Sequence, residues 1–172
     1  TNTDAKTQAR IGTLKTTHGI IETPVFMPIA TKGTVKHLTP HDLSTLGTQA
    51  LIANAFLLYL RPGLTTLKKS GGLHTFMQWN KPLFTDSGGF QILSPKFFQT
   101  ITDKGVTFNN PYLKKTEHFT PEKVITIENA IGGDVIMALD HVPHHDHSHA
   151  AVQEAVRRTH HWAARCKKAH TN

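Results

Sequence analysis

The segment from Thr85 to Gln91 (TDSGGFQ) combines residue types that suit the binding of a flat ring rich in hydrogen-bond donors. Asp86 follows a short apolar run, which predicts a carboxylate at the end of a buried strand. Gly88 and Gly89 allow a tight turn and a close approach of the backbone to a ligand. Phe90 offers a stacking face. The pattern predicts a pocket for a heterocycle such as guanine, and the alternative is an ordinary strand-to-helix turn capped by Asp86.

A second carboxylate, Asp140, closes another apolar run, Asp134–Leu139. The carboxyl ends of parallel strands meet at one edge of a sheet, so we expect Asp86 and Asp140 to share that edge. The ring N–H and exocyclic amino group of guanine form a donor edge that a carboxylate reads well. The alternative for Asp140 is a helix cap or a salt bridge in a loop.

The stretch from His141 to His149 holds five histidines and an acid, which raises a metal-site hypothesis and, with it, a metal-dependent hydrolase. The spacing matches neither a helix nor a strand, and zinc sites depend on fixed ligand spacing. We therefore interpret it as a solvated loop and predict no metal ligands in this chain.

The secondary-structure elements that position these residues are predicted to alternate along the chain, each strand being followed by a helix. Near-continuous apolar runs separated by helices indicate a parallel sheet covered by helices. After an N-terminal hairpin around Thr17–Gly19, we predict one α/β domain over residues 1–172. Four β/α units are expected, which would make a partial barrel. The predicted strands are Pro24–Ala30, Ala50–Phe56, Pro82–Thr85 and Asp134–Leu139, and the predicted helices begin at Thr39, Leu64, Thr120 and Ser148.

The composition favours a polyanionic partner, because the 172-residue chain carries a formal net charge of +7. Basic residues cluster on the last predicted helix, where phosphate contact and a solvated face are the two interpretations. A single cysteine, Cys166, allows neither an intrachain disulfide nor a cysteine-based zinc site, and favours the cytoplasm. The longest apolar run is too short for a membrane span, so no membrane partner is expected.

The motif from Thr85 to Gln91 resembles the base-recognition segment of bacterial and eukaryotic tRNA-guanine transglycosylases. Other segments agree with that family in order, over about residues 9–168. These segments are Thr23–Pro28 (TPVFMP), Leu60–Gly63 (LRPG), Gly71–Met77 (GGLHTFM), Thr120–Lys123 (TPEK) and Asp134–Asp140 (DVIMALD).

The resemblance implies a TIM-type (β/α)8 barrel with an inserted zinc-binding subdomain. It implies exchange of the wobble guanine of tRNA for a 7-deazaguanine, by double displacement at the ribose, in queuosine biosynthesis. Asp86 matches the acid–base carboxylate, Asp140 the carboxylate that reads the base edge, and Ser87, Gly88, Gly89 and Phe90 the base-binding turn. Partners expected from the resemblance are tRNA, guanine or a 7-deazaguanine, and a second chain in a homo- or heterodimer.

Departures from the family bear on the base and on turnover. Val142 stands where the family lines the base pocket and resembles members that take queuine, so preQ1 and queuine both stay open. Ala55–Leu58 (AFLL) replaces the usual Thr-Tyr-His-Leu. The nucleophilic Asp and the structural zinc site of the family lie in the C-terminal part, beyond this chain. We therefore expect this chain alone to be inactive, and the alternative is a non-catalytic purine- or tRNA-binding subunit that needs a complementing chain.

Overall fold

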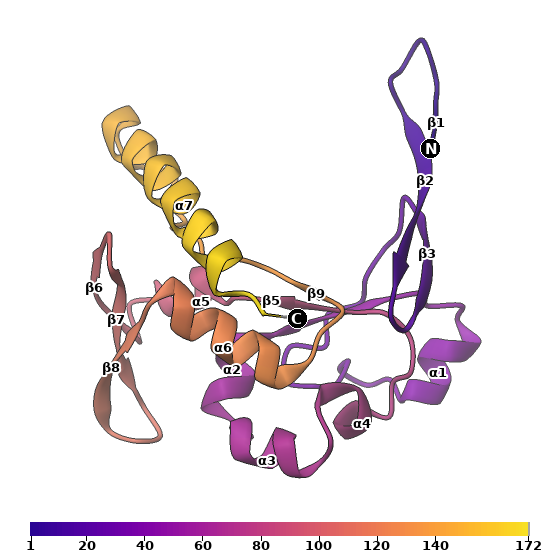
Figure 1. Cartoon of the computed structure of the whole chain (residues 1–172), viewed down its shortest axis with the longest axis horizontal. Helices are drawn as coiled ribbons and strands as arrows, with labels where there is room; N and C mark the ends of the chain where they lie inside the picture. The colour runs from indigo at the N-terminus through magenta and orange to yellow at the C-terminus, as the bar shows by residue number, and fades with distance from the viewer. Residues whose placement is uncertain (172) are drawn as a thin grey trace.

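A computed structural model describes residues 1–171 and shows an α/β chain built around a short parallel sheet. In the described residues this sheet has the order β4-β5-β9. An N-terminal antiparallel sheet and the sheet β6-β7-β8 lie on opposite sides of it (Figure 1). The sheets are partial and form no closed barrel within residues 1–171. The prediction of an α/β fold is confirmed, and the count of four β/α units stays a prediction.

The parallel sheet consists of β4 (Leu51–Asn54), β5 (Leu83–Asp86) and β9 (Val135–Ile136). Asn54 is the register partner of Asp86, so both stand at the carboxyl ends of adjacent strands. The strand predicted over Ala50–Phe56 ends early because the Asn54 side chain accepts a hydrogen bond from Leu57 N at 2.9 Å and begins helix α2 (Ala55–Leu60). β9 is shorter than predicted, since the chain pairs with β5 over two residues only.

The prediction of a buried strand at Pro24–Ala30 is wrong as a regular strand. A single bridge joins Ile29 to Ile52 of β4, with Ala30 N donating to Ile52 O at 2.7 Å. The two prolines of this run carry no N–H, which prevents a continuous ladder. Phe26 is 82% exposed and so lies outside the core.

The N-terminal sheet contains β1 (Asn2–Thr3), β2 (Arg10–Thr16) and β3 (Gly19–Thr23). Thr16 pairs with Gly19, so the predicted hairpin around Thr17–Gly19 is confirmed. Its turn carries His18 to the amino end of the parallel sheet, where the His18 backbone N–H and ring both bond to Asp134.

The predicted helix starts are confirmed. Thr39 forms a capping box with Asp42 at the start of α1 (Pro40–Thr45), and Thr120 caps α6 (Pro121–Ile131). Proline in the first turn fits both starts, because its missing N–H has no partner there anyway. Two short helices, α3 (Leu64–Lys69) and α4 (Leu73–Met77), follow α2, and α4 was not predicted.

A second antiparallel sheet contains β6 (Phe98–Thr102), β7 (Gly105–Asn110) and β8 (Lys115–Phe119). The turn at Asp103–Gly105 joins β6 to β7, and β8 pairs with the other edge of β7. Phe56, Phe108 and Phe119 meet edge to face and join this sheet to α2 in the core.

The last helix, α7 (His149–Ala169), begins at Ser148 as predicted and projects from the body with its N-terminal end outermost (Figure 1). Ala155, Trp162 and Cys166 form its buried stripe, and Trp162 Nε1 donates to Asp103 O at 2.8 Å. Among the helices over residues 1–171, none has the length and apolar character that crossing a bilayer requires.

Candidate functional site

Asp86 is held from one side by the strand next to it. Asn54 Nδ2 donates to Asp86 Oδ2 at 2.7 Å and to Gln91 Oε1 at 2.9 Å. Gly88 N donates to Asp86 Oδ1 at 3.0 Å, so the carboxylate also caps the turn that follows it. A capped turn and a ligand site are the two interpretations of this segment. The two interpretations are compatible. The hydrogen bonds that cap the turn fix the orientation of the Asp86 carboxylate, and the side chain is only half buried, so it can still contact a ligand at the sheet edge.

The glycine turn brings the second carboxylate to the same place. Gly88 has a left-handed φ of 82°, and a Cβ there would collide with Phe56 and lie 3.1 Å from Asn54 Oδ1. A Cβ on Gly89 would collide with Asp140 Oδ1 and lie 2.8 Å from Asp140 O. Asp140 therefore packs directly against the turn that follows Asp86. The structure brings the two predicted acids together at one end of the sheet, and neither is fully buried.

Charge repulsion acts between these acids. Burial raises the pKa of Asp140 above its ordinary value, and the charge of Asp86 raises it further. Two carboxylates that share a site favour a state in which one of them holds a proton. Such a pair is suited to accept a donor-rich ligand edge and to exchange a proton with it.

Behind Asp86 lies a third carboxyl group, which the sequence analysis missed. Glu128 of α6 is fully buried, and neither carboxyl oxygen has a hydrogen-bond partner within residues 1–171. The Thr85 hydroxyl faces it without forming a well-aligned hydrogen bond. Burial raises the pKa of Glu128 to about 8, and the charge of Asp86 adds to this shift. Its position in an amphipathic helix gave no signal, because a glutamate on α6 is ordinarily solvated.

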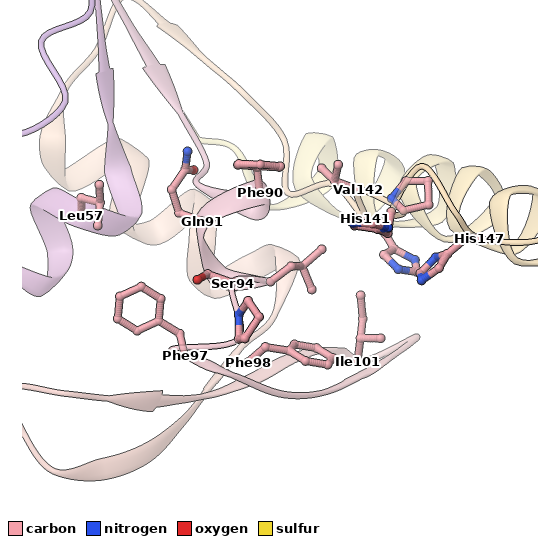
Figure 2. Close-up of a pocket in the computed structure, with 14 residues that line it drawn as sticks. Leu57, Phe90, Gln91, Ser94, Phe97, Phe98, Ile101, His141, Val142 and His147 are labelled. Atoms are coloured by element: carbon pink, nitrogen blue, oxygen red, sulfur yellow. The ribbon is translucent and has the colours of Figure 1, made fainter.

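Phe90 projects from the start of α5 (Gly89–Ile92) and is 69% exposed. It lines a largely apolar pocket of about 720 Å³ with Val142, Phe98 and Ile101 (Figure 2). Neither Asp86 nor Asp140 lines that pocket. Asp140 instead lines an adjoining hollow of about 310 Å³, and the segment from His141 to Pro143 borders both spaces. Phe90 and Asp140 thus border two different hollows, which the segment from His141 to Pro143 separates, and Asp86 lines neither of the two. Ser87, the other member of the predicted turn, is buried.

The histidine-rich loop is exposed, as its interpretation as a solvated segment requires. His144 and His145 both contact Asp146, at 3.3 Å and 3.0 Å, and all three side chains are solvated. His144 and His147 also border the apolar pocket.

The three arginines of α7 bind carboxylates of this chain. Arg157 and Arg158 both contact Asp103, at 2.6 Å and 3.0 Å, and Arg165 contacts Glu122 at 2.7 Å. The pairs with Asp103 fix α7 against the turn between β6 and β7, and the pair with Glu122 fixes it against α6. They favour a structural role for these arginines over direct phosphate contact.

A cluster that sequence analysis missed lies at the other end of the parallel sheet. His18 Nδ1 lies 2.8 Å from Asp134 Oδ1, and His74 Nε2 lies 3.1 Å from Asp134 Oδ2. Burial and the nearby His18 lower the pKa of His74. His74 lies 60 positions and His18 lies 116 positions before Asp134 in the sequence, so no local motif could have indicated this cluster.

Comparison with known proteins gives one consistent result. The family model described as "TGT: Queuine tRNA-ribosyltransferase" matches residues 4–172. A queuine tRNA-ribosyltransferase of Caldanaerobacter subterraneus is 46% identical over 169 residues, which is 98% of this chain and 45% of that protein. The proteins of the same name from Desulforudis audaxviator and Gloeobacter violaceus are 44% and 47% identical, over 96% and 95% of this chain and 45% and 43% of their own lengths. The chain therefore spans less than half the length of these relatives.

Proposed function

Because this chain belongs to the queuine tRNA-ribosyltransferase family, we propose that it carries the base-recognition part of a tRNA-guanine transglycosylase. The whole enzyme would be a pentosyltransferase that exchanges the wobble guanine of tRNA for a 7-deazaguanine, either preQ1 or queuine. The observation that supports this most directly is the contact between Asp140 and Gly89, which brings the second carboxylate against the turn that follows Asp86 at the end of β5.

In this proposal Asp140 accepts hydrogen bonds from the ring N–H and the exocyclic amino group of the base. Asp86 accepts or returns the proton that the base gains or loses during exchange. The glycines let the backbone approach the base. Phe90 is exposed but borders a different hollow from Asp140, so stacking of its ring on the same base requires the segment from His141 to Pro143 to shift. The donor edge of the base would relieve the repulsion between the two acids, which gives the pair a physical reason to bind it.

We assign no residue of this chain as the nucleophile that attacks the ribose, and no cofactor to the exchange reaction. From the family resemblance we expect that nucleophile, and a structural zinc site, in the part of the relatives that this chain does not match. The proposed partners are tRNA and a free base, in a homo- or heterodimer that works in the cytoplasm. Activity of the chain alone is therefore not expected.

The proposal is tested by calorimetry with 7-aminomethyl-7-deazaguanine and with queuine. We expect the chain to bind one of them saturably, and Asp86→Asn and Asp140→Asn to weaken binding at least tenfold. Asp146→Asn, which changes an exposed acid outside the site, is the matched control. Equal heats for all four proteins would refute base recognition by this pair.

Exchange is measured separately, with guanine-wobble tRNA and labelled guanine. Base binding without incorporation of label is the expected result for this chain by itself. Incorporation without added protein would contradict the division of roles proposed above.

A further inference from the structure

Three side chains of metal-binding type converge at the amino ends of β5 and β9. His18 comes from the turn between β2 and β3, His74 from α4, and Asp134 from the residue before β9. Their potential ligand atoms all lie within 4.8 Å of one another. The two imidazole rings stack with their centroids 3.7 Å apart. Each ring also presents one nitrogen to the carboxylate of Asp134.

This cluster is separate from the proposed base site. Asp134 accepts a hydrogen bond from Leu83 N, at the first residue of β5, whereas Asp86 is the last residue of that strand. The cluster and the two acids thus occupy opposite ends of the parallel sheet. A ligand bound at one end has no contact with a ligand bound at the other.

The carboxylate of Asp134 is oriented before any ion arrives. Its side chain is 1% exposed, and its two oxygens accept the backbone N–H groups of Leu83 at 2.9 Å and His18 at 3.1 Å. Ligating carboxylates in proteins are held by such outer hydrogen bonds, which fix the direction of their remaining lone pairs. The buried acid therefore resembles a preformed ligand.

The distances between the groups suit a small transition-metal ion. Two ligands on a tetrahedral zinc ion, each at about 2.0–2.1 Å from the metal, lie roughly 3.3 Å apart. The nitrogen-to-oxygen distances of 2.8 Å and 3.1 Å run to the two different oxygens of Asp134, so a small expansion would let an ion enter between the imidazoles and the carboxylate and bind one or both of its oxygens. His18 is 38% exposed, which leaves an open side for entry of the ion and for a water ligand.

We propose that His18, His74 and Asp134 form a binding site for a divalent transition metal, with zinc as the ion that best fits two imidazoles and one carboxylate. The three ligands belong to three segments, so a bound ion ties the N-terminal hairpin and α4 to the base of the sheet. Such an ion stabilises the folded chain in proportion to the logarithm of its concentration.

The test adds zinc chloride to the metal-free chain, after a second cluster that could also bind zinc has been removed by mutation. His144, His145 and Asp146 form a second, exposed cluster, so His144→Asn and His145→Asn are combined in a reference variant. We expect the reference variant to bind one zinc ion and to melt at a higher temperature with zinc. Co²⁺ in place of zinc is expected to give the visible absorption of a tetrahedral site.

In the reference background, His18→Gln and Asp134→Asn are each expected to weaken zinc binding at least tenfold and to abolish the rise in melting temperature. His118→Gln changes an exposed histidine on β8 and serves as the matched control. Because Asp134→Asn also alters the hydrogen bonds to Leu83 and His18, it could impair folding. His18→Gln, in a surface turn, then decides the question.

Two results would overturn the proposal. The first is a reference variant that binds no zinc saturably, which would make the cluster a purely hydrogen-bonded support. The second is zinc binding by His18→Gln as tight as that of the reference variant, which would place the ion elsewhere on the surface. Neither result bears on base recognition by Asp86 and Asp140.

Discussion

Gly89 and Asp140 are packed so closely that the glycine has no room for a side chain. A Cβ on Gly89 would collide with Asp140 Oδ1 and lie 2.8 Å from Asp140 O. Gly89 has an ordinary φ, so only space, and not backbone strain, requires glycine here. Gly89→Ala is expected to destabilise the chain by about 1–3 kcal/mol and to weaken base binding, because Asp140 must move. Urea denaturation and calorimetry measure the two effects.

A matched control for this variant is Gly47→Ala. Gly47 has a left-handed φ of 73° and no neighbouring atom within 4 Å of the added Cβ. The substitution is expected to cost about 1 kcal/mol through backbone strain alone and to leave base binding unchanged. A Gly89→Ala protein that retained full stability and full binding would contradict the contact between Gly89 and Asp140.

Asn54 supplies the neutral donor that orients Asp86. Asn54→Asp keeps an acceptor for the helix cap but sets a second carboxylate against Asp86, where the amide lay 2.7 Å away. One of the two acids must then take up a proton, so we expect a loss of about 1–3 kcal/mol at pH 7 that largely disappears at pH 4. Urea denaturation at both pH values measures it. Ser148→Asp, an acidic cap on exposed α7, should show no such dependence, and a pH-independent loss in Asn54→Asp would exclude repulsion as its cause.

Glu128 makes stability depend on pH in the opposite direction to an ordinary salt-bridged acid. Its pKa is raised from 4.5 to about 8, so the folded state keeps a proton that the unfolded state releases above pH 4.5. The contribution of Glu128 to stability is greatest below pH 4.5 and falls as the pH rises to about 8, by on the order of 4 kcal/mol.

Glu128→Gln removes this titration while keeping the shape of the side chain. We expect the variant to match the wild type near pH 4.5 and to exceed its stability at pH 8, as measured by urea denaturation across that range. Glu22→Gln, on exposed β3, is the matched control and should leave the pH profile unchanged. Parallel profiles for wild type and Glu128→Gln would show that Glu128 ionises freely in the folded chain.

The elements that sequence analysis predicted correctly are those with local signals. Thr39 and Thr120 are N-cap residues that precede a proline, which marks a helix start in the sequence. The segments that form β4 and β5 are short apolar runs, which indicates buried strands. The placement of Asp86 beside Asp140 was also predictable in outline, because parallel strands present their carboxyl ends at one edge.

The features that were missed depend on contacts between distant segments. Pro24–Ala30 is apolar like a strand, but its two prolines lack the donors that a ladder needs. Glu128 looks like a solvated helix residue until α6 is packed against Thr85. His18, His74 and Asp134 lie in three distant segments with no characteristic spacing, and they meet only when the hairpin, α4 and the sheet pack together.

Arg165 and Glu122 form the contact that joins α7 to the start of α6. Arg165 Nε and Nη2 donate to the two oxygens of Glu122, both at 2.7 Å, and Nη1 donates to Asp103 O at 2.7 Å. Hydrogen bonds from Arg165 lower the pKa of Glu122 to about 2 from 4.5. The stability that this pair contributes is therefore present above pH 4.5 and is lost as the pH falls through about 2.

Lysine cannot form the two-pronged contact, and Glu122 is half exposed, so Arg165→Lys is expected to cost about 0.5–1 kcal/mol at pH 7. Urea denaturation at pH 7 and pH 2.5 should show the difference shrinking at the lower pH, whereas Arg10→Lys, on exposed β2, should match the wild type at both. A cost that stayed constant down to pH 2.5 would mean that packing of the arginine stem, and not its charge, holds α7 in place.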